Sequence, residues 1–280
     1  MKKLLLTWIL LFSLLGSAGT GEMNSDTEMS LLAINVRKAD ALLLRSGKSA
    51  YLIDTGSKKS ADTMLDVLRK EGITRLTGVI LTHTHSDHAG GLKDLLASDI
   101  IIDNIYAPKY YVLKKEDGKH PIEKAFKKTA ERDVTWLTAG DTLPLDGGKL
   151  TVIGPLVKDE VENNNSLVLL AEGGGGSMLL TGDMEFPEEN SLLNAGVIPR
   201  ADVLKIGNHG EGDATSNALL AAVRPALAVI STNSDDEPDT PDPRVLLALK
   251  TNSIPVLVTE DAQEGILVTL RNGELMTEIK

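Results

Sequence analysis

The sequence predicts an α/β protein folded as a four-layer α/β/β/α sandwich. Short apolar segments typical of strands alternate with amphipathic segments typical of helices from Leu31 to the end of the chain. The strand segments come as hairpins in each half of the chain, with helices between them. Two mixed sheets that pack face to face, with the helices on their outer faces, bury the apolar side of every element.

The first half of the chain is expected to contain short strands with helices between them. Strands are expected over residues 31–36, 41–46, 49–54, 77–83 and 99–107, and helices over residues 60–70, 89–97 and 121–131. The first of these helices is indicated by Ala61, Leu65 and Leu68, which recur every three or four residues and therefore share one helix face.

The second half is expected to contain further strands and helices. Strands are expected over residues 134–137, 149–154, 166–171, 177–183, 201–210, 225–231, 254–259 and 265–271, and helices over residues 187–195, 215–223 and 243–250. The glycine run Gly173–Gly176 predicts a tight turn, so residues 166–182 are interpreted as a hairpin. Asn272 and Gly273 predict another turn near the end of the chain.

The two ends of the chain predict one domain behind an export signal. A positively charged start, an apolar run over Leu4–Leu15 and small residues over Gly16–Gly19 are typical of a secretory signal peptide, which we place at residues 1–19. The alternative is an uncleaved anchor helix, but the apolar run is shorter than the roughly 20 residues that span a bilayer. Residues 20–29 are a polar linker, and residues 30–280 form the domain. We therefore expect a secreted or periplasmic protein with no stable membrane span after cleavage.

The composition excludes several classes of function. The 280 residues include no cysteine, which excludes disulfide scaffolds, thiolate metal sites and cysteine nucleophiles. The formal net charge is −11, and aromatic residues make up only 3% of the chain. An acidic chain with few stacking groups is poorly suited to hold a long nucleic acid, because phosphate neutralisation and base stacking supply that affinity. A small-molecule substrate is expected instead, and the oligomeric state is not determined by these features.

A histidine cluster is the main chemical signal. The chain has five histidines, and His83, His85 and His88 fall close together with Asp87. They follow an apolar strand, where a turn can direct several side chains at one point. Imidazole and carboxylate groups are suitable ligands for zinc, manganese or iron. A solvated histidine-rich loop is the alternative, but this spacing favours a metal site.

The same residues belong to a series of motifs. The motifs are Ile34–Ala41, Leu52–Gly56, His83–His88, Asn165–Leu169, Leu179–Asp183 and Leu204–Gly210. In this order they resemble the metallo-β-lactamase superfamily, and more narrowly the soluble metallohydrolase domain of the ComEC-type DNA-internalisation competence proteins. The resemblance covers residues 30–280 and implies a sandwich of the metallo-β-lactamase type.

The resemblance implies a set of site residues. The implied ligands of one or two divalent metal ions are His83, His85, Asp87, His88, Asp183 and His209. Zinc is the first candidate and manganese the second. Asp183 would bridge two metals, and its alternative role is a turn or helix N-cap. His209 would be a ligand or a substrate contact, and its alternative is a surface histidine at the end of a strand. Asp87 and His209 are the candidate catalytic residues, Asp54 is expected to orient the ligands from behind, and Asn208 is a candidate substrate contact. His120 lies in a charged stretch outside this set.

Several positions depart from the family pattern. Arg37 and Lys38 stand where the family has glycine and glutamine, and Asn208 and Thr240 stand where it has histidines. Residues Asn163–Ser166 occupy the place of a further histidine ligand of the wider superfamily. These departures predict that one of the two metals is weakly held or absent.

The leading hypothesis is an exported metal-dependent hydrolase that attacks a phosphodiester or another small ester with metal-activated water. A lactam, lactone or thioester substrate stays open, because fold does not determine function. The alternative hypothesis is a metal-binding but catalytically degraded member that acts as a binding or scaffold protein, as the changes at Asn208 and Thr240 suggest.

Overall fold

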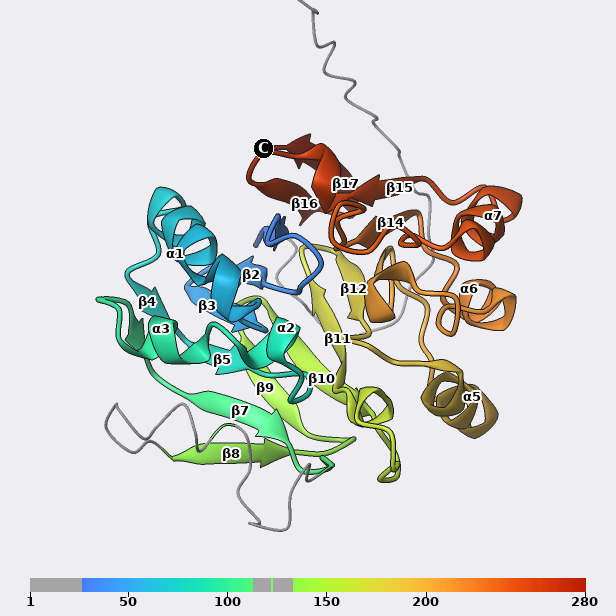
Figure 1. The fold of residues 1–280 in the computed structure, drawn as a ribbon, viewed down its shortest axis with the longest axis horizontal. Helices are drawn as coiled ribbons and strands as arrows, with labels where there is room; N and C mark the ends of the chain where they lie inside the picture. Colours follow the sequence, from blue (N-terminus) through green and yellow to red (C-terminus); the bar gives the residue numbers. More distant parts are fainter. Residues whose placement is uncertain (1–26, 113–121, 123–132) are drawn as a thin grey trace, which may run out of the picture.

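Two β-sheets lie face to face in the computed structural model, which describes residues 27–112, 122 and 133–280 (Figure 1). The eight-stranded sheet has the order β17 (Glu274–Ile279), β16 (Gly265–Arg271), β1 (Met29–Ile34), β2 (Leu42–Ser46), β3 (Ser49–Ile53), β5 (Gly78–Ile80), β7 (Ile105–Pro108) and β8 (Val134–Leu137). The seven-stranded sheet has the order β15 (Val256–Val258), β14 (Leu227–Ile230), β13 (Val203–Lys205), β12 (Gly176–Leu180), β11 (Val168–Gly173), β10 (Gly148–Gly154) and β9 (Thr142–Leu145).

Helices cover the outer face of each sheet, so the predicted four-layer α/β/β/α architecture is confirmed. One outer layer contains α1 (Ala61–Lys70), α2 (Ser86–Ala89) and α3 (Leu92–Leu96), and the other contains α5 (Phe186–Ala195), α6 (Asn217–Val223) and α7 (Pro243–Thr251) (Figure 1). In the described part of the chain, no helix has the length and apolar character needed to cross a membrane.

The strands near the middle of each sheet are buried on both faces, as a four-layer fold requires. In β1, Leu31 and Ala33 pack into the core between the two sheets, whereas Leu32 and Ile34 pack into the core beneath α1 and α3. A third core, between the second sheet and α5–α7, includes Leu204 and Ile230. The alternation of side chains along each strand thus divides one apolar segment between two layers.

Each sheet is antiparallel in one part and parallel in the other. Strands β3, β5 and β7 run parallel to one another, and so do β12, β13 and β14. Because parallel strands end at the same edge of a sheet, the loops that follow them gather there, and such an edge is where α/β folds place their sites. Asp54 follows β3, the histidine cluster follows β5, Asp183 follows β12 and His209 follows β13.

Both predicted turns are confirmed. Strands β11 and β12 form an antiparallel hairpin in which Gly173 lies opposite Gly176, and the two residues between them have positive φ angles of 61° and 78°. Asn272 and Gly273 likewise connect β16 to β17 with φ angles of 52° and 77°. Two successive left-handed residues match the twist of the strands that they join.

The helix expected over residues 89–97 is wrong in its extent, because the chain forms α2 and then α3, separated by Gly90 and Gly91. A Cβ atom at Gly90 would lie 2.1 Å from the carbonyl oxygen of Ser86, and one at Gly91 would lie 2.2 Å from that of Thr55. A Cβ atom at Gly90 would also lie 2.6 Å from the backbone nitrogen of Lys58. The contacts with Thr55 and Lys58 place the two glycines directly against the segment after β3.

Other boundaries also differ from the prediction. The strand expected over residues 99–107 is two strands: β6 (Ile101–Ile102) pairs with β4 (Arg75–Leu76), and β7 joins the large sheet. Asn104 lies at the break, where its side chain donates to the carbonyl oxygen of Thr77. The strand expected over 201–210 ends at Lys205. Met29 belongs to β1 rather than to the linker, because it is buried in the core between the sheets.

Some of the predicted segments lie outside the described residues. These are the signal peptide over residues 1–19, the linker up to residue 26, the histidine His120, and the helix over residues 121–131 except Ile122. Strand β9 was not predicted. It contains Pro144 and lies at the edge of its sheet, where a residue without an N–H group is tolerated.

Truncation of Leu169 tests the core between the sheets. Leu169 is fully buried in β11, so we expect Leu169→Ala to lower the free energy of unfolding by about 2–5 kcal/mol. The matched control is Leu247→Ala on α7, where the leucine is 64% exposed and the same truncation should change stability by less than about 0.5 kcal/mol. Urea denaturation measures both values, and equal losses would contradict this assignment of the core.

Candidate metal centre

The predicted ligands converge at the edge where the parallel strands end. His83 and His85 come from the loop after β5, Asp87 and His88 come from α2, and Asp183 follows β12. His209 lies in the short 3-10 turn Asn208–Gly210 after β13. Residues from both sheets therefore contribute to one site, and Asp183 lies close to both histidine groups.

The potential ligands form two groups that share Asp183. In the first group, one atom each from His83, His85 and Asp183 lies within 4.8 Å of the others. The second group contains Asp183 with Asp87, His88 and His209, within the same distance. A shared carboxylate between two sets of donors is the arrangement needed to hold two metal ions side by side.

The imidazole of His88 is fixed by two carboxylates. Its Nδ1 atom lies 2.7 Å from Oδ2 of Asp54, and its Nε2 atom lies 3.0 Å from Oδ2 of Asp183. Asp54 also accepts hydrogen bonds from the backbone N–H and the hydroxyl of Thr82, both at 2.7 Å. The Thr82 hydroxyl lies 3.2 Å from Nδ1 of His83. Asp54 therefore orients His88 directly and His83 through Thr82, as carboxylates behind metal-ligating histidines do.

His209 is held by a backbone carbonyl. Its Nδ1 atom lies 2.9 Å from the carbonyl oxygen of Ser231, which can only accept, so Nδ1 carries a proton and donates to it. The Nε2 atom of His209 lies 3.2 Å from Nε2 of His88 and 3.4 Å from Oδ2 of Asp87. His209 and Asp54 both have positive φ angles, 53° and 59°, which are uncommon for residues other than glycine and typical of functional sites.

The donor atoms fit a metal ion. Nε2 of His83 and Oδ1 of Asp183 are buried and have no hydrogen-bond partner. Such orphaned polar atoms are costly unless a cation or water satisfies them. The facing Nε2 atoms of His88 and His209 likewise need a proton or a cation between them. Nitrogen and carboxylate donors in this number suit zinc, and manganese accepts the same types.

Burial and neighbouring charges shift the pKa values of these residues in different directions. Burial lowers the pKa of His83 well below its usual value, so this imidazole is neutral. Burial raises the pKa of Asp183, but the charges of His88 and His209 outweigh it and hold that pKa well below its usual value. For Asp87, burial is likewise outweighed by the hydrogen bond with His209, and the pKa is lowered. Burial lowers the pKa of His88 and of His209, but the charge of Asp183 outweighs it and raises both values. A metal ion that binds here therefore displaces protons from these two imidazoles, because ligation requires neutral imidazole and ionised carboxylate.

Two buried carboxylates near the site were missed by the sequence analysis. Asp40 accepts a hydrogen bond from Nζ of Lys205 at 2.8 Å, and both side chains are at most 1% exposed. Its other oxygen lies 4.0 Å from Nδ1 of His209. Glu162 accepts from the backbone N–H of Thr84 at 3.0 Å and thereby anchors the turn between His83 and His85. The pairing of Asp40 with Lys205 gives no signal in the sequence, although both residues lie within the motifs.

Asn208, the candidate substrate contact, is only 4% exposed, and its side-chain amide donates to Oδ1 of Asp213 at 3.0 Å. A role in substrate binding therefore stays a prediction. His85 and Asp87 are the partly exposed members of the two ligand groups, whereas the other members are buried. The open side of the centre is therefore the side of His85 and Asp87.

Comparison with known proteins gives matches over most of the chain. A family model for the metallo-beta-lactamase superfamily matches residues 34–234. ComE operon protein 3 of Bacillus subtilis is 29% identical over 259 residues, which are 85% of this chain and 32% of that protein. Recombination protein 2 of Haemophilus influenzae is 32% identical over 197 residues, which are 68% of this chain and 22% of that protein. The chain thus spans about a third or less of these curated relatives.

Solved structures share the fold at low sequence identity. The metallo-beta-lactamase fold protein YhfI from Bacillus subtilis superposes with a TM-score of 0.56 at 16% identity, covering 87% of this chain and 99% of that one. A diphosphatase from the PhnP family superposes with a TM-score of 0.54 at 13% identity, covering 89% and 98%. These likenesses establish the fold of the sandwich.

The Asp40–Lys205 ion pair yields a stability prediction. In Lys205→Met the carboxylate of Asp40 stays buried without its partner, so we expect unfolding to become easier by about 3–5 kcal/mol. The double variant with Asp40→Asn should recover part of that loss. Arg69→Met removes an exposed cation whose partners are Asp66 and Asp99, and should cost less than about 1 kcal/mol. Chemical denaturation that gives the same loss for Lys205→Met and Arg69→Met would contradict the analysis.

Proposed function

Because this chain belongs to the metallo-beta-lactamase superfamily, and within it resembles the ComEC-type competence proteins, we propose that it is a metal-dependent hydrolase of a small phosphodiester. The observation that carries the proposal is Asp183, a buried carboxylate shared by two groups of metal-type donors. The competence and recombination proteins among its relatives favour a phosphodiester over other esters.

The residues of the chain have distinct tasks in this proposal. His83, His85 and Asp183 would hold one metal ion, and Asp183, Asp87, His88 and His209 would hold the second. When bound, such ions lower the pKa of water and polarise the phosphoryl oxygen. Zinc is the first candidate and manganese the second.

Asp87 has the position of a general base. Its side chain is 33% exposed on the open side of the centre, and its lowered pKa keeps it ionised at neutral pH. An ionised carboxylate there accepts a proton from the attacking water and orients its lone pair toward the substrate. His209 is fixed by the carbonyl oxygen of Ser231, and its Nε2 atom lies 3.4 Å from Oδ2 of Asp87.

A small substrate is proposed because acidic residues neutralise the basic residues of the loop after β1. Arg37 binds Asp236 through two N–H groups, at 2.7 and 2.8 Å, and Lys38 pairs with Glu211. These cations are therefore not free to neutralise a long phosphate backbone, which would also meet the net negative charge of the chain.

The second candidate function is a metal-binding protein with degraded hydrolysis. It is favoured by Asn208, which stands where the family has a histidine and whose amide is already bonded to Asp213. Turnover of bis(p-nitrophenyl) phosphate with added zinc or manganese distinguishes the two functions. Metal binding without turnover of this or related ester substrates would favour the second. Export stays a prediction from the sequence, since residues 1–19 lie outside the described residues.

Replacement of Asp87 tests the proposed chemistry. We expect Asp87→Asn to lower kcat on bis(p-nitrophenyl) phosphate by about 10²–10⁴-fold, because an amide cannot accept the proton. The fold should be retained, since Asp87 is a partly exposed residue at the edge of the sheet. The matched control is Asp62→Asn on the exposed face of α1, which should leave kcat unchanged. Full activity of Asp87→Asn would remove this residue from the mechanism.

Duplex DNA is expected to bind weakly or not at all. At about 150 mM salt, an anisotropy titration with metal present should show no saturable micromolar binding, because the chain has 29 Lys and Arg against 40 Asp and Glu. Saturable micromolar binding, or efficient cleavage of long DNA, would show that the local field of the metal centre outweighs the net charge.

A further inference from the structure

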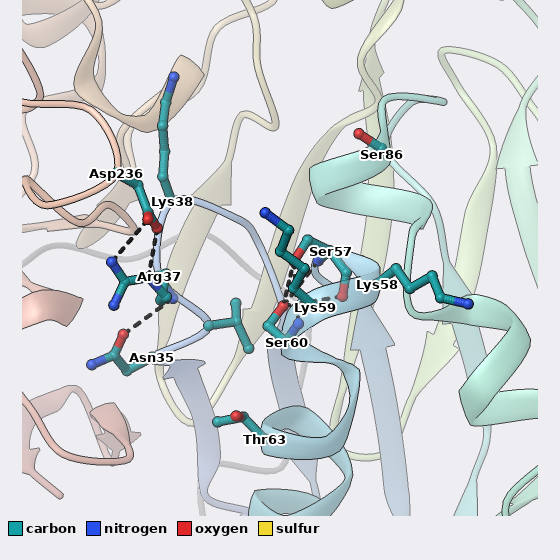
Figure 2. Close-up of a pocket in the computed structure, with 11 residues that line it drawn as sticks. Asn35, Arg37, Lys38, Ser57, Lys58, Lys59, Ser60, Thr63, Ser86 and Asp236 are labelled. Atoms are coloured by element: carbon teal, nitrogen blue, oxygen red, sulfur yellow. Dashed lines mark hydrogen bonds and ion pairs between the residues drawn. The ribbon is translucent and has the colours of Figure 1, made fainter.

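A cavity of about 550 Å³ is lined mainly by basic and hydroxyl side chains. Its lining includes Arg37, Lys38, Ser57, Lys58, Lys59 and Ser86 (Figure 2). These residues come from the loop after β1, the turn before α1, and the first position of α2. We call this cavity the basic pocket.

The basic pocket lies beside the segment that carries the potential ligands. Ser86 stands between the potential ligands His85 and Asp87 in the sequence, and it lines the pocket. A Cβ atom at Gly90 would lie 2.6 Å from the backbone nitrogen of Lys58, so the turn that carries Lys58 packs directly on the loop that carries the ligands. A substrate at the metal centre therefore has the basic pocket as its neighbour.

The free positive charge of the basic pocket comes from two lysines. Arg37 is bound to Asp236, and Lys38 to Glu211. Lys58 and Lys59 are exposed and form no ion pair with a carboxylate of the described residues. In Figure 2, Lys59 extends from its turn toward the side of Arg37, and Lys58 extends the other way. In a chain of net charge −11, these unpaired cations make a local site for an anion.

We propose that the basic pocket holds a second phosphate group of the substrate, so that the substrate is a phosphodiester with a terminal phosphate. This inference rests on the proposed function, because it places the scissile phosphodiester at the metal centre. A terminal phosphate carries between one and two negative charges and has three strong acceptor oxygens. Lys59 supplies an ammonium donor on the side of Arg37, and Lys58 adds positive charge on the other side of the same turn. The Ser86 hydroxyl supplies a neutral donor next to Asp87 in the sequence.

The kinetic test compares dithymidine monophosphate with the same dinucleotide bearing a 5′- or a 3′-terminal phosphate. With the metal-loaded protein, we expect one terminal phosphate to lower KM about tenfold, and the double variant Lys58→Ala with Lys59→Ala to lose that advantage. The variant should cleave the unphosphorylated dinucleotide as the parent does. The matched control is Lys48→Ala, an exposed lysine at the amino end of β3, far from the edge where Asp54 lies.

A binding measurement separates failure of this inference from failure of the proposed function. Titration calorimetry uses dithymidine with an uncleavable methylphosphonate linkage, with and without each terminal phosphate. Suppose that no dinucleotide is hydrolysed, but that a terminal phosphate still strengthens binding and the double variant loses this gain. The basic pocket is then a phosphate site, and the proposed hydrolase function is wrong. If neither terminal phosphate improves KM or binding, or if Lys48→Ala causes the same loss, the basic pocket is not a phosphate site.

Discussion

The burial of one carboxylate, Asp183, is the constraint on which the rest of the structure depends. Its side chain is 3% exposed and lies 3.0–3.6 Å from nitrogen atoms of His83, His88 and His209. A charge in such a place costs several kcal/mol unless cations or hydrogen-bond donors surround it. The histidines that surround Asp183 follow β5 and β13, and Asp183 itself follows β12. The fold must therefore place the carboxyl ends of these three strands next to one another.

The residues around Asp183 are held in place by a further ring of buried polar groups. Asp54 orients two of the histidines, and the carbonyl oxygen of Ser231 orients His209. The buried Asp40–Lys205 ion pair lies next to His209, since the second oxygen of Asp40 is 4.0 Å from Nδ1 of that histidine. Buried networks of this kind specify one geometry because every unsatisfied member would be costly. The basic pocket lies outside the ring, where side chains are exposed and can adapt to a ligand.

The layers and the hairpins were predictable because they follow from local patterns. Apolar alternation divides a strand such as β1 between two cores, and the glycines of the β11–β12 turn need no distant partner. The histidine spacing likewise predicted where the donors would gather. Tertiary contacts were not predictable: Lys205 and Asp40 are 165 residues apart, and the close approach of Gly90 to Lys58 joins segments that are distant in the sequence. The close backbone contacts at Gly90 and Gly91 lie just after the potential ligands Asp87 and His88 of the metal centre.

The metal content of the pure protein tests the central claim most directly. After dialysis against zinc and removal of the excess, elemental analysis should find one or two zinc ions per chain, and Asp183→Asn should hold at most half as many while it keeps its circular dichroism spectrum. The control Asp236→Asn changes an exposed carboxylate in the same way and should keep as many ions as the parent protein. A parent protein that retains no metal, or an Asp183→Asn variant that retains as many ions as the parent, would contradict a centre built around Asp183.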